Sequence, residues 1–151
     1  MAARSKDVVT VARNRRAKYD YEIVDTFEAG LQLTGTEVKS LREGHATIAE
    51  GYVQVKSGEA WLVGAYIPEY AFGNINNHPP RRDRKLLLHR HQIDRVAAKL
   101  KEQGFTAVPM SIYFNQGKAK LEFGLGKGKK KYDKRHAERE KDARRAMRDA
   151  Y

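Results

Sequence analysis

The chain has 151 residues and a hydrophobic content of 40%, which is enough for one compact domain with a single core. Its formal net charge of +11 favours a polyanionic partner, either nucleic acid or an acidic membrane surface. Because it has no cysteine and no long apolar run, disulfides, thiolate metal sites and thiol nucleophiles are excluded, and neither a membrane-spanning helix nor a secretory signal is expected. These features predict a soluble, intracellular protein.

The first predicted element is a long strand. Over residues 19–34, apolar side chains keep odd positions and polar ones mostly keep even positions, the period of two that a half-buried strand requires. We expect a bend or bulge at residues 28–30. A short helix over residues 37–43 is predicted to follow, capped by Thr36 and ended by Gly44.

A hairpin and a loop are predicted next. Residues 52–56 and 60–67 read as two strands that turn at Ser57 and Gly58. The face of this hairpin expected in the core contains Trp61, Val63, Ala65 and Ile67. Residues 68–85 are rich in Gly, Asn and Pro and end in a basic cluster, which favours a surface loop.

The last predicted elements are a helix and a second hairpin. Apolar residues recur at helical spacing over residues 90–103, and Gly104 can end that helix. Strands over residues 110–114 and 119–125 are expected to turn at residues 115–117. Antiparallel strands with a helix between two hairpins predict a mainly β fold with about three short helices, an antiparallel barrel of the oligonucleotide-binding type.

The predicted organisation is a flexible arm over residues 1–13, a barrel over 14–126 and a basic tail over 127–151. The tail has eleven basic and five acidic side chains and no Leu, Ile, Val, Phe or Trp. Such a segment buries too little apolar surface to offset its ordering entropy, so we expect it to be disordered alone and helical when bound. The alternative is a charged tail that only aids solubility.

No enzyme motif is found. The glycine-rich stretch 124–130 fails the Walker pattern, because Phe123 stands where the first glycine is needed. His89 and His91 lack further ligands at a metal-binding spacing, and no serine lies in a nucleophile elbow. We therefore predict a non-catalytic protein with no cofactor and no metal.

Five ordered blocks resemble the SmpB family of SsrA-binding proteins, and the match spans nearly the whole chain. The blocks are Asn14-Arg15-Arg16-Ala17, Phe27-Glu28-Ala29-Gly30, Gly35-Thr36-Glu37-Val38-Lys39-Ser40-Leu41-Arg42, Arg84-Lys85-Leu86-Leu87-Leu88, and Gly126-Lys127-Gly128-Lys129-Lys130 followed by Asp133-Lys134-Arg135. The resemblance implies a cytoplasmic, monomeric barrel that binds the transfer-RNA-like part of transfer-messenger RNA. With elongation factor Tu it would deliver that RNA to stalled ribosomes, its tail helical in the empty messenger channel.

The resemblance also implies roles for individual residues. In the barrel the expected RNA contacts are Glu28, Lys39, Arg42, Arg84, Lys85, Leu87 and His89, with Arg84 and Lys85 on phosphates. In the tail the expected ribosome contacts are Lys127, Lys129, Lys130, Lys131, Tyr132, Asp133, Lys134 and Arg135. The alternatives are a structural salt bridge for Glu28 and core packing for Leu87.

Two other functions use the same features. A generic single-strand RNA-binding barrel or ribosome-assembly factor would carry the same basic surface, and it would bind RNA regardless of the RNA's fold. An RNA-processing enzyme would need clustered acidic residues for metal ions, whereas the acidic residues here are scattered.

Overall fold

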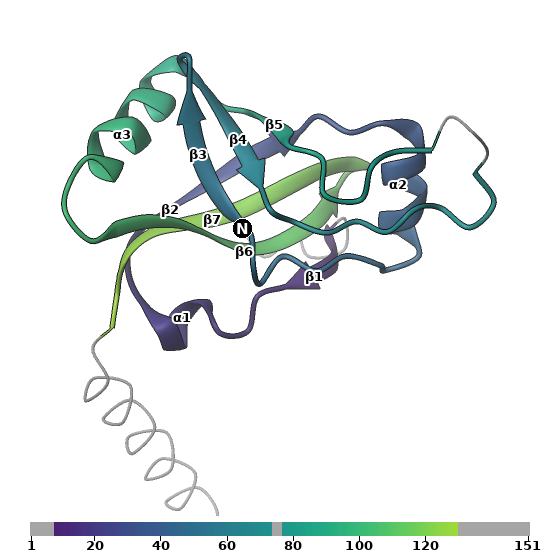
Figure 1. Ribbon diagram of the computed structural model, residues 1–151, viewed down its shortest axis with the longest axis horizontal. Coiled ribbons are helices and arrows are strands. Elements are labelled where there is room, and N and C mark those ends of the chain that lie inside the picture. The colour runs from purple at the N-terminus through teal and green to yellow at the C-terminus, as the bar shows by residue number, and fades with distance from the viewer. Residues whose placement is uncertain (1–7, 74–76, 130–151) are drawn as a thin grey trace, which may run out of the picture.

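The computed structural model describes residues 8–73 and 77–129, which contain seven strands and three short helices (Figure 1). In chain order these are β1 (Val8–Arg13), α1 (Ala17–Asp20), β2 (Tyr21–Leu31), α2 (Gly35–Arg42), β3 (Tyr52–Lys56), β4 (Glu59–Val63), β5 (Arg84–Leu87), α3 (Arg90–Leu100), β6 (Phe105–Asn115) and β7 (Lys118–Gly128). All the strand pairs are antiparallel. The predicted class, mainly β with about three helices, is confirmed.

The strand pairs close into a ring. The order is β6, β3, β4, β5, β2 and β7, and β7 pairs again with β6. The join between β3 and β6 is the narrowest, with Val53 opposite Ala107. Strand β1 lies outside the ring, on the second half of β6. Figure 1 shows α3 and α2 at opposite ends of the long strands β2, β6 and β7.

The N-terminal boundary differs from the prediction. Residues 8–13, expected to belong to a flexible arm, form β1 and pair with residues 111–115 of β6. A short helix, α1, then precedes β2, which begins at Tyr21 rather than at residue 19. The folded body therefore begins at least six residues earlier than the sequence predicted, because its first strand gains backbone hydrogen bonds from a distant partner.

No bulge occurs at residues 28–30, where a bend or bulge was predicted, since these residues pair without interruption with residues 120–122 of β7. The irregularity in β2 lies instead between Ile23 and Asp25. Glycines on β7 make the close approach possible: a Cβ at Gly126 would lie 2.6 Å from the Glu22 carbonyl oxygen. These glycines thus belong to the sheet, and β7 continues two residues beyond the predicted end of the barrel.

Helix α2 is capped by Thr34 rather than by the predicted Thr36. The Thr34 hydroxyl accepts a hydrogen bond from the Glu37 N–H at 3.4 Å, and the Glu37 carboxylate accepts one from the Thr34 N–H at 2.9 Å. This reciprocal arrangement is a capping box. Thr36 instead shares a hydrogen bond with the Nδ1 atom of buried His78, at 2.9 Å.

Both hairpin turns lie where they were predicted, with Ser57 and Gln116 at positive φ beside their glycines. The predicted core face of the first hairpin was Trp61, Val63, Ala65 and Ile67, and the prediction is wrong for Trp61 and Val63. The last two are buried, but within β4 the buried residues are Ala60 and Leu62. Gly64, at φ +81°, ends the strand and shifts the alternation by one residue.

The core fills the inside of the ring. It contains Phe27, Ala29, Leu31, Leu41, Ile48, Val53, Ala60, Leu62, Ala65, Ile67, Leu86, Ile93, Val96, Ala107, Ile112, Phe114, Leu121, Phe123 and Leu125. The rings of Phe27 and Phe123 stack with centroids 5.4 Å apart. Helix α3 contributes Ile93 and Val96 and so covers one end of the ring. Burying each large side chain of this kind stabilises the fold by about 1.5–3 kcal/mol.

Candidate nucleic-acid interface

A hollow opens on the outer face of the sheet, beside the first turn of α3. We call it the first hollow, and it is lined by Glu28, Gly30, Gly58, Glu59, Lys85, Leu86, Leu87, Leu88, His89, Arg90, Gln92, Ile93 and Lys120. Gly30 on β2 pairs with Leu87 on β5 and with Lys120 on β7, so three strands form its floor. A Cβ on Gly30 would lie 3.3 Å from that of Leu87, so the glycine leaves room for the leucine.

Four residues singled out from the sequence meet in this hollow: Glu28, Lys85, Leu87 and His89. Glu28 comes from β2, and the other three come from β5 and the residues that lead into α3. The pairing of β2 with β5 brings these two segments together.

Leu87 and His89 are both exposed. Leu87 is 53% exposed, whereas its neighbour Leu86 is 1% exposed, so the alternative of core packing for Leu87 is wrong. His89 caps α3, where its backbone N–H donates to the Gln92 side chain at 3.1 Å, and its ring stacks on that of His91 with centroids 5.8 Å apart. An exposed leucine beside a stacked imidazole is a surface suited to an unpaired or end-on base.

Glu28 is fixed by a hydrogen bond rather than by a salt bridge. The Tyr113 hydroxyl, on β6, donates to the Glu28 carboxylate. Burial raises the pKa of the Tyr113 phenol, and the hydrogen bond to Glu28 and the negative charges of Glu28 and Glu122 raise it further. Tyr113 therefore stays protonated, and the second oxygen of Glu28 remains available as an acceptor.

Replacing Tyr113 with phenylalanine tests this hydrogen bond. Because the folded state holds the phenol proton more tightly than the unfolded state, the stabilisation is complete below the ordinary tyrosine pKa of about 10 and declines as the pH rises above it. We expect Tyr113→Phe to lower the free energy of unfolding by about 1 kcal/mol at neutral pH. Denaturant titrations at neutral pH and at about pH 11 should show a smaller gap at the higher pH. An equal gap at both would contradict the assignment.

The hollow also contains basic residues that the sequence reasoning missed. Lys120 has no ion-pair partner within the described ranges 8–73 and 77–129. Arg90, also missed, donates to the Gly58 carbonyl at 2.8 Å. Lys85, which was predicted, pairs with Glu59 at 3.2 Å. Lys120 could have been found from the period of two in β7, where it lies on the face opposite buried Leu121.

This chain is similar to known proteins over most of its length. The family model described as SmpB protein matches residues 11–151. The chain belongs to the SmpB family. An SsrA-binding protein of Leifsonia xyli is 58% identical over 96% of this chain and 94% of the relative. One of Thermobifida fusca is 56% identical over 91% of this chain and 86% of the relative.

A solved structure of the SmpB family is also similar. It is described as "tmRNA-SmpB: a journey to the center of the bacterial ribosome", and it aligns with a TM-score of 0.68 at 47% sequence identity. The alignment covers 83% of this chain and 86% of that one. The family resemblance read from five short blocks is thus confirmed over most of the sequence.

Arg84, which lies in one of the SmpB blocks, was predicted to contact phosphate, and this prediction is wrong. It is 0% exposed, and its Nε atom donates to the Glu37 carboxylate at 2.7 Å. Its other two nitrogens donate to the carbonyls of Ala65 and Pro80, each at 2.9 Å. All three guanidinium nitrogens are occupied inside the protein, so Arg84 supports the fold and does not contact phosphate.

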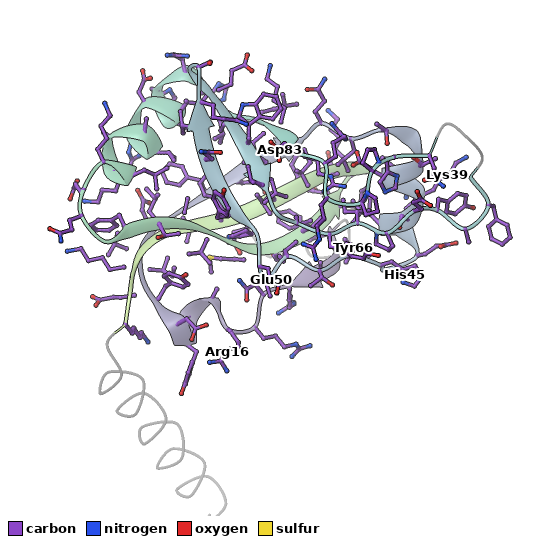
Figure 2. The ribbon with its side chains drawn as sticks, viewed as in Figure 1. Arg16, Lys39, His45, Glu50, Tyr66 and Asp83 are labelled. Carbon is purple, nitrogen blue, oxygen red and sulfur yellow. The ribbon has the colours of Figure 1, made fainter. Side chains whose placement is uncertain are left out.

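Two more residues predicted from the SmpB resemblance lie outside the first hollow. Lys39 and Arg42 are on α2, and Figure 2 shows Lys39 at the opposite end of the molecule from α3. The Lys39 ammonium lies 5.6 Å from the Tyr70 ring centre, and the Arg42 guanidinium 4.7 Å from that of Phe114. Their role in RNA binding stays a prediction.

The tail is described only at its start. Lys127 is exposed at the end of β7 with its ammonium 5.1 Å from the Phe105 ring centre, and the Lys129 N–H donates to the Asp20 carbonyl at 2.8 Å. The other predicted ribosome contacts, Lys130, Lys131, Tyr132, Asp133, Lys134 and Arg135, lie outside the described residues.

Within the described ranges, no three His, Asp or Glu side chains are placed to hold a metal ion. Nor does the described part of the chain contain a helix long and apolar enough to cross a membrane.

Proposed function

We propose that this chain binds the transfer-RNA-like part of transfer-messenger RNA through the first hollow and acts in the rescue of stalled ribosomes. The observation that carries the proposal is the meeting of Glu28, Lys85, exposed Leu87 and His89 in one hollow. Membership of the SmpB family, and the similar structure described with tmRNA and the ribosome, support it. None of these three observations requires the protein to catalyse a reaction.

The groups in the hollow suit a folded RNA. Lys85, Arg90 and Lys120 are placed for phosphates, while the free oxygen of Glu28 can accept from a base N–H or a ribose 2′-hydroxyl. Leu87 offers an apolar surface and the stacked histidine rings an aromatic one for the face of a base. A hollow that combines these contacts discriminates by RNA shape and by exposed bases rather than by charge alone.

The proposal extends to the tail and to further partners. Residues 127–151 carry a net charge of +6, and we propose that they enter the empty messenger channel and contact ribosomal RNA there. Elongation factor Tu would accompany the complex through the RNA, and the chain would act as a monomer in the cytoplasm. Exposed Lys127, at the junction of barrel and tail, is the first residue proposed to contact the ribosome.

A competition assay tests RNA selectivity. Labelled transfer-messenger RNA bound to the full chain is challenged with excess ordinary transfer RNA and with unstructured RNA at near-physiological salt. Selective retention of the labelled RNA is the expected result. Displacement of the labelled RNA by both competitors would favour a generic single-strand RNA-binding protein, because such a surface tolerates any sequence and fold.

Leu87→Ala tests the apolar part of the hollow. We expect about tenfold weaker binding of transfer-messenger RNA, equivalent to about 1.4 kcal/mol, because the substitution removes most of one exposed apolar contact. Val24→Ala is the matched control, since Val24 is 55% exposed and lies outside the hollow. Both variants should unfold at the wild-type denaturant concentration. Equal affinities for the two variants would remove Leu87 from the site.

A further inference from the structure

A second hollow lies on the outer side of β1 and β6. It is lined by both strands, the turn into α1 and Glu122 of β7, and it presents the cations Arg13, Arg15 and Lys18. All three are exposed, and none has an acidic partner among residues 8–73 and 77–129. Neighbouring Arg16 differs, because it pairs with Asp20 at 3.2 Å. The hollow therefore contains three uncompensated positive charges and one carboxylate.

The backbone that presents these cations is held in place. The Asn14 side chain donates to the Pro109 carbonyl at 3.0 Å, its backbone N–H donates to the Met110 carbonyl at 2.8 Å, and its Oδ1 accepts from the Arg16 N–H at 3.3 Å. Ala17 is buried beneath the turn. The backbone positions of Arg13, Arg15 and Lys18 are thus set before any ligand arrives, which lowers the entropic cost of binding.

Strand register joins this hollow to the first one. Leu87 lies opposite Gly30, Gly30 opposite Lys120, Lys120 opposite Tyr113, and Tyr113 opposite Thr10, a row across five strands. Directly opposite residues in antiparallel strands project from the same face. At about 4.8 Å per strand the row is about 19 Å long. The hydroxyl of Tyr113, which lines the second hollow, reaches Glu28 in the first.

We propose that the second hollow is a phosphate-binding site for the same RNA molecule that occupies the first, so that one RNA spans the face from β5 to β1. The proposal rests on the proposed function. Three unpaired cations suit the phosphates of a polynucleotide, whereas a flat membrane surface would not reach into a concave site. The hydrogen-bonded pair of Tyr113 and Glu28 lies between the two hollows, so an RNA that occupies both would pass over this pair.

The double variant Arg13→Gln/Arg15→Gln tests the second hollow. Removal of one phosphate contact should lower the slope of log affinity against log salt by about 1, so we expect a slope lower by about 1–2 and an affinity at least about tenfold weaker at near-physiological salt. Lys99→Gln/Lys101→Gln is the control, because it removes the same net charge from the far end of α3 and should leave the slope unchanged.

Backbone footprinting of the bound RNA gives a second readout. The nucleotides that become unprotected with Arg13→Gln/Arg15→Gln should adjoin those that become unprotected with Leu87→Ala. The proposal would be overturned if Arg13→Gln/Arg15→Gln bound with the same affinity and salt slope as the control. It would also be overturned if the double variant changed protection only on an RNA other than the one that loses protection with Leu87→Ala. If wild type fails to discriminate transfer-messenger RNA, the proposed function fails, and the slope comparison on whichever RNA binds still decides the second hollow.

Discussion

Glu37→Gln is expected to lower the free energy of unfolding by about 3–5 kcal/mol, a large part of the roughly 5–15 kcal/mol typical of a domain. Glu37 and Arg84 are both 0% exposed, with the carboxylate 2.7 Å from the Arg84 Nε atom. A second arginine, Arg82, donates to the same carboxylate at 2.6 Å. Glutamine keeps the shape but leaves the Arg84 charge buried without a counter-charge.

The pH dependence has a definite sign. Burial raises the pKa of Glu37, but the hydrogen bonds from Arg82, the Thr34 N–H and Arg84, together with the Arg84 charge, outweigh it, so the pKa lies below its usual value. The carboxylate therefore contributes stability that is complete above the unfolded-state pKa of about 4.3 and is lost as the pH falls through the lower folded-state value. Glu37→Gln should lack this acid-dependent component.

Urea unfolding at neutral pH and at successively lower pH measures both effects. Arg82→Gln is the matched control, because the Arg82 side chain is 32% exposed and its removal leaves the Glu37–Arg84 pair intact; a cost of about 1 kcal/mol or less is expected. If Glu37→Gln cost no more than Arg82→Gln, the buried pair would not be important for stability.

The pairing of Glu37 with Arg84 could not be predicted from the sequence. Arg84 lies in a run of basic residues that local composition assigns to a surface loop, and its partner is 47 positions away on α2. No periodicity links the two. The same holds for β1, whose pairing with β6 depends on residues near the other end of the fold's sequence. Local patterns predicted both hairpin turns well, because positive φ beside glycine is a property of adjacent residues.

The candidate site was partly predictable. Glu28, Lys85, Leu87 and His89 came from the family resemblance, and the fold places them together. Lys120 was missed because its role depends on register: it lies opposite Gly30, which in turn lies opposite Leu87. The side chains of a strand can be assigned to two faces from sequence, but the neighbours of each face are known only once the strand order is known.

A chain that ends after Lys129 is expected to fold and bind transfer-messenger RNA like the full chain but to be inactive in ribosome rescue. The cut point follows from the sheet: β7 continues to Gly128, and the Lys129 N–H donates to the Asp20 carbonyl. Ending the chain after Gly126 would instead remove the pairs that Lys127 makes with β2 and β6 and that Gly128 makes with β2, at a cost of about 1–3 kcal/mol. Unfolding measurements on the two truncations check this boundary.

Rescue is measured as tagging of the product translated from a messenger without a stop codon, with transfer-messenger RNA supplied. Residues 130–151 carry nine basic and five acidic side chains, so their removal also deletes a net charge of +4. A full-length chain with these residues in shuffled order keeps that charge and separates the two explanations. If neither variant supports tagging, the order of side chains along the tail matters, as binding within a narrow channel requires. Tagging restored by the shuffled tail would mean that the tail acts through charge alone, and tagging retained after truncation would remove the tail from the mechanism.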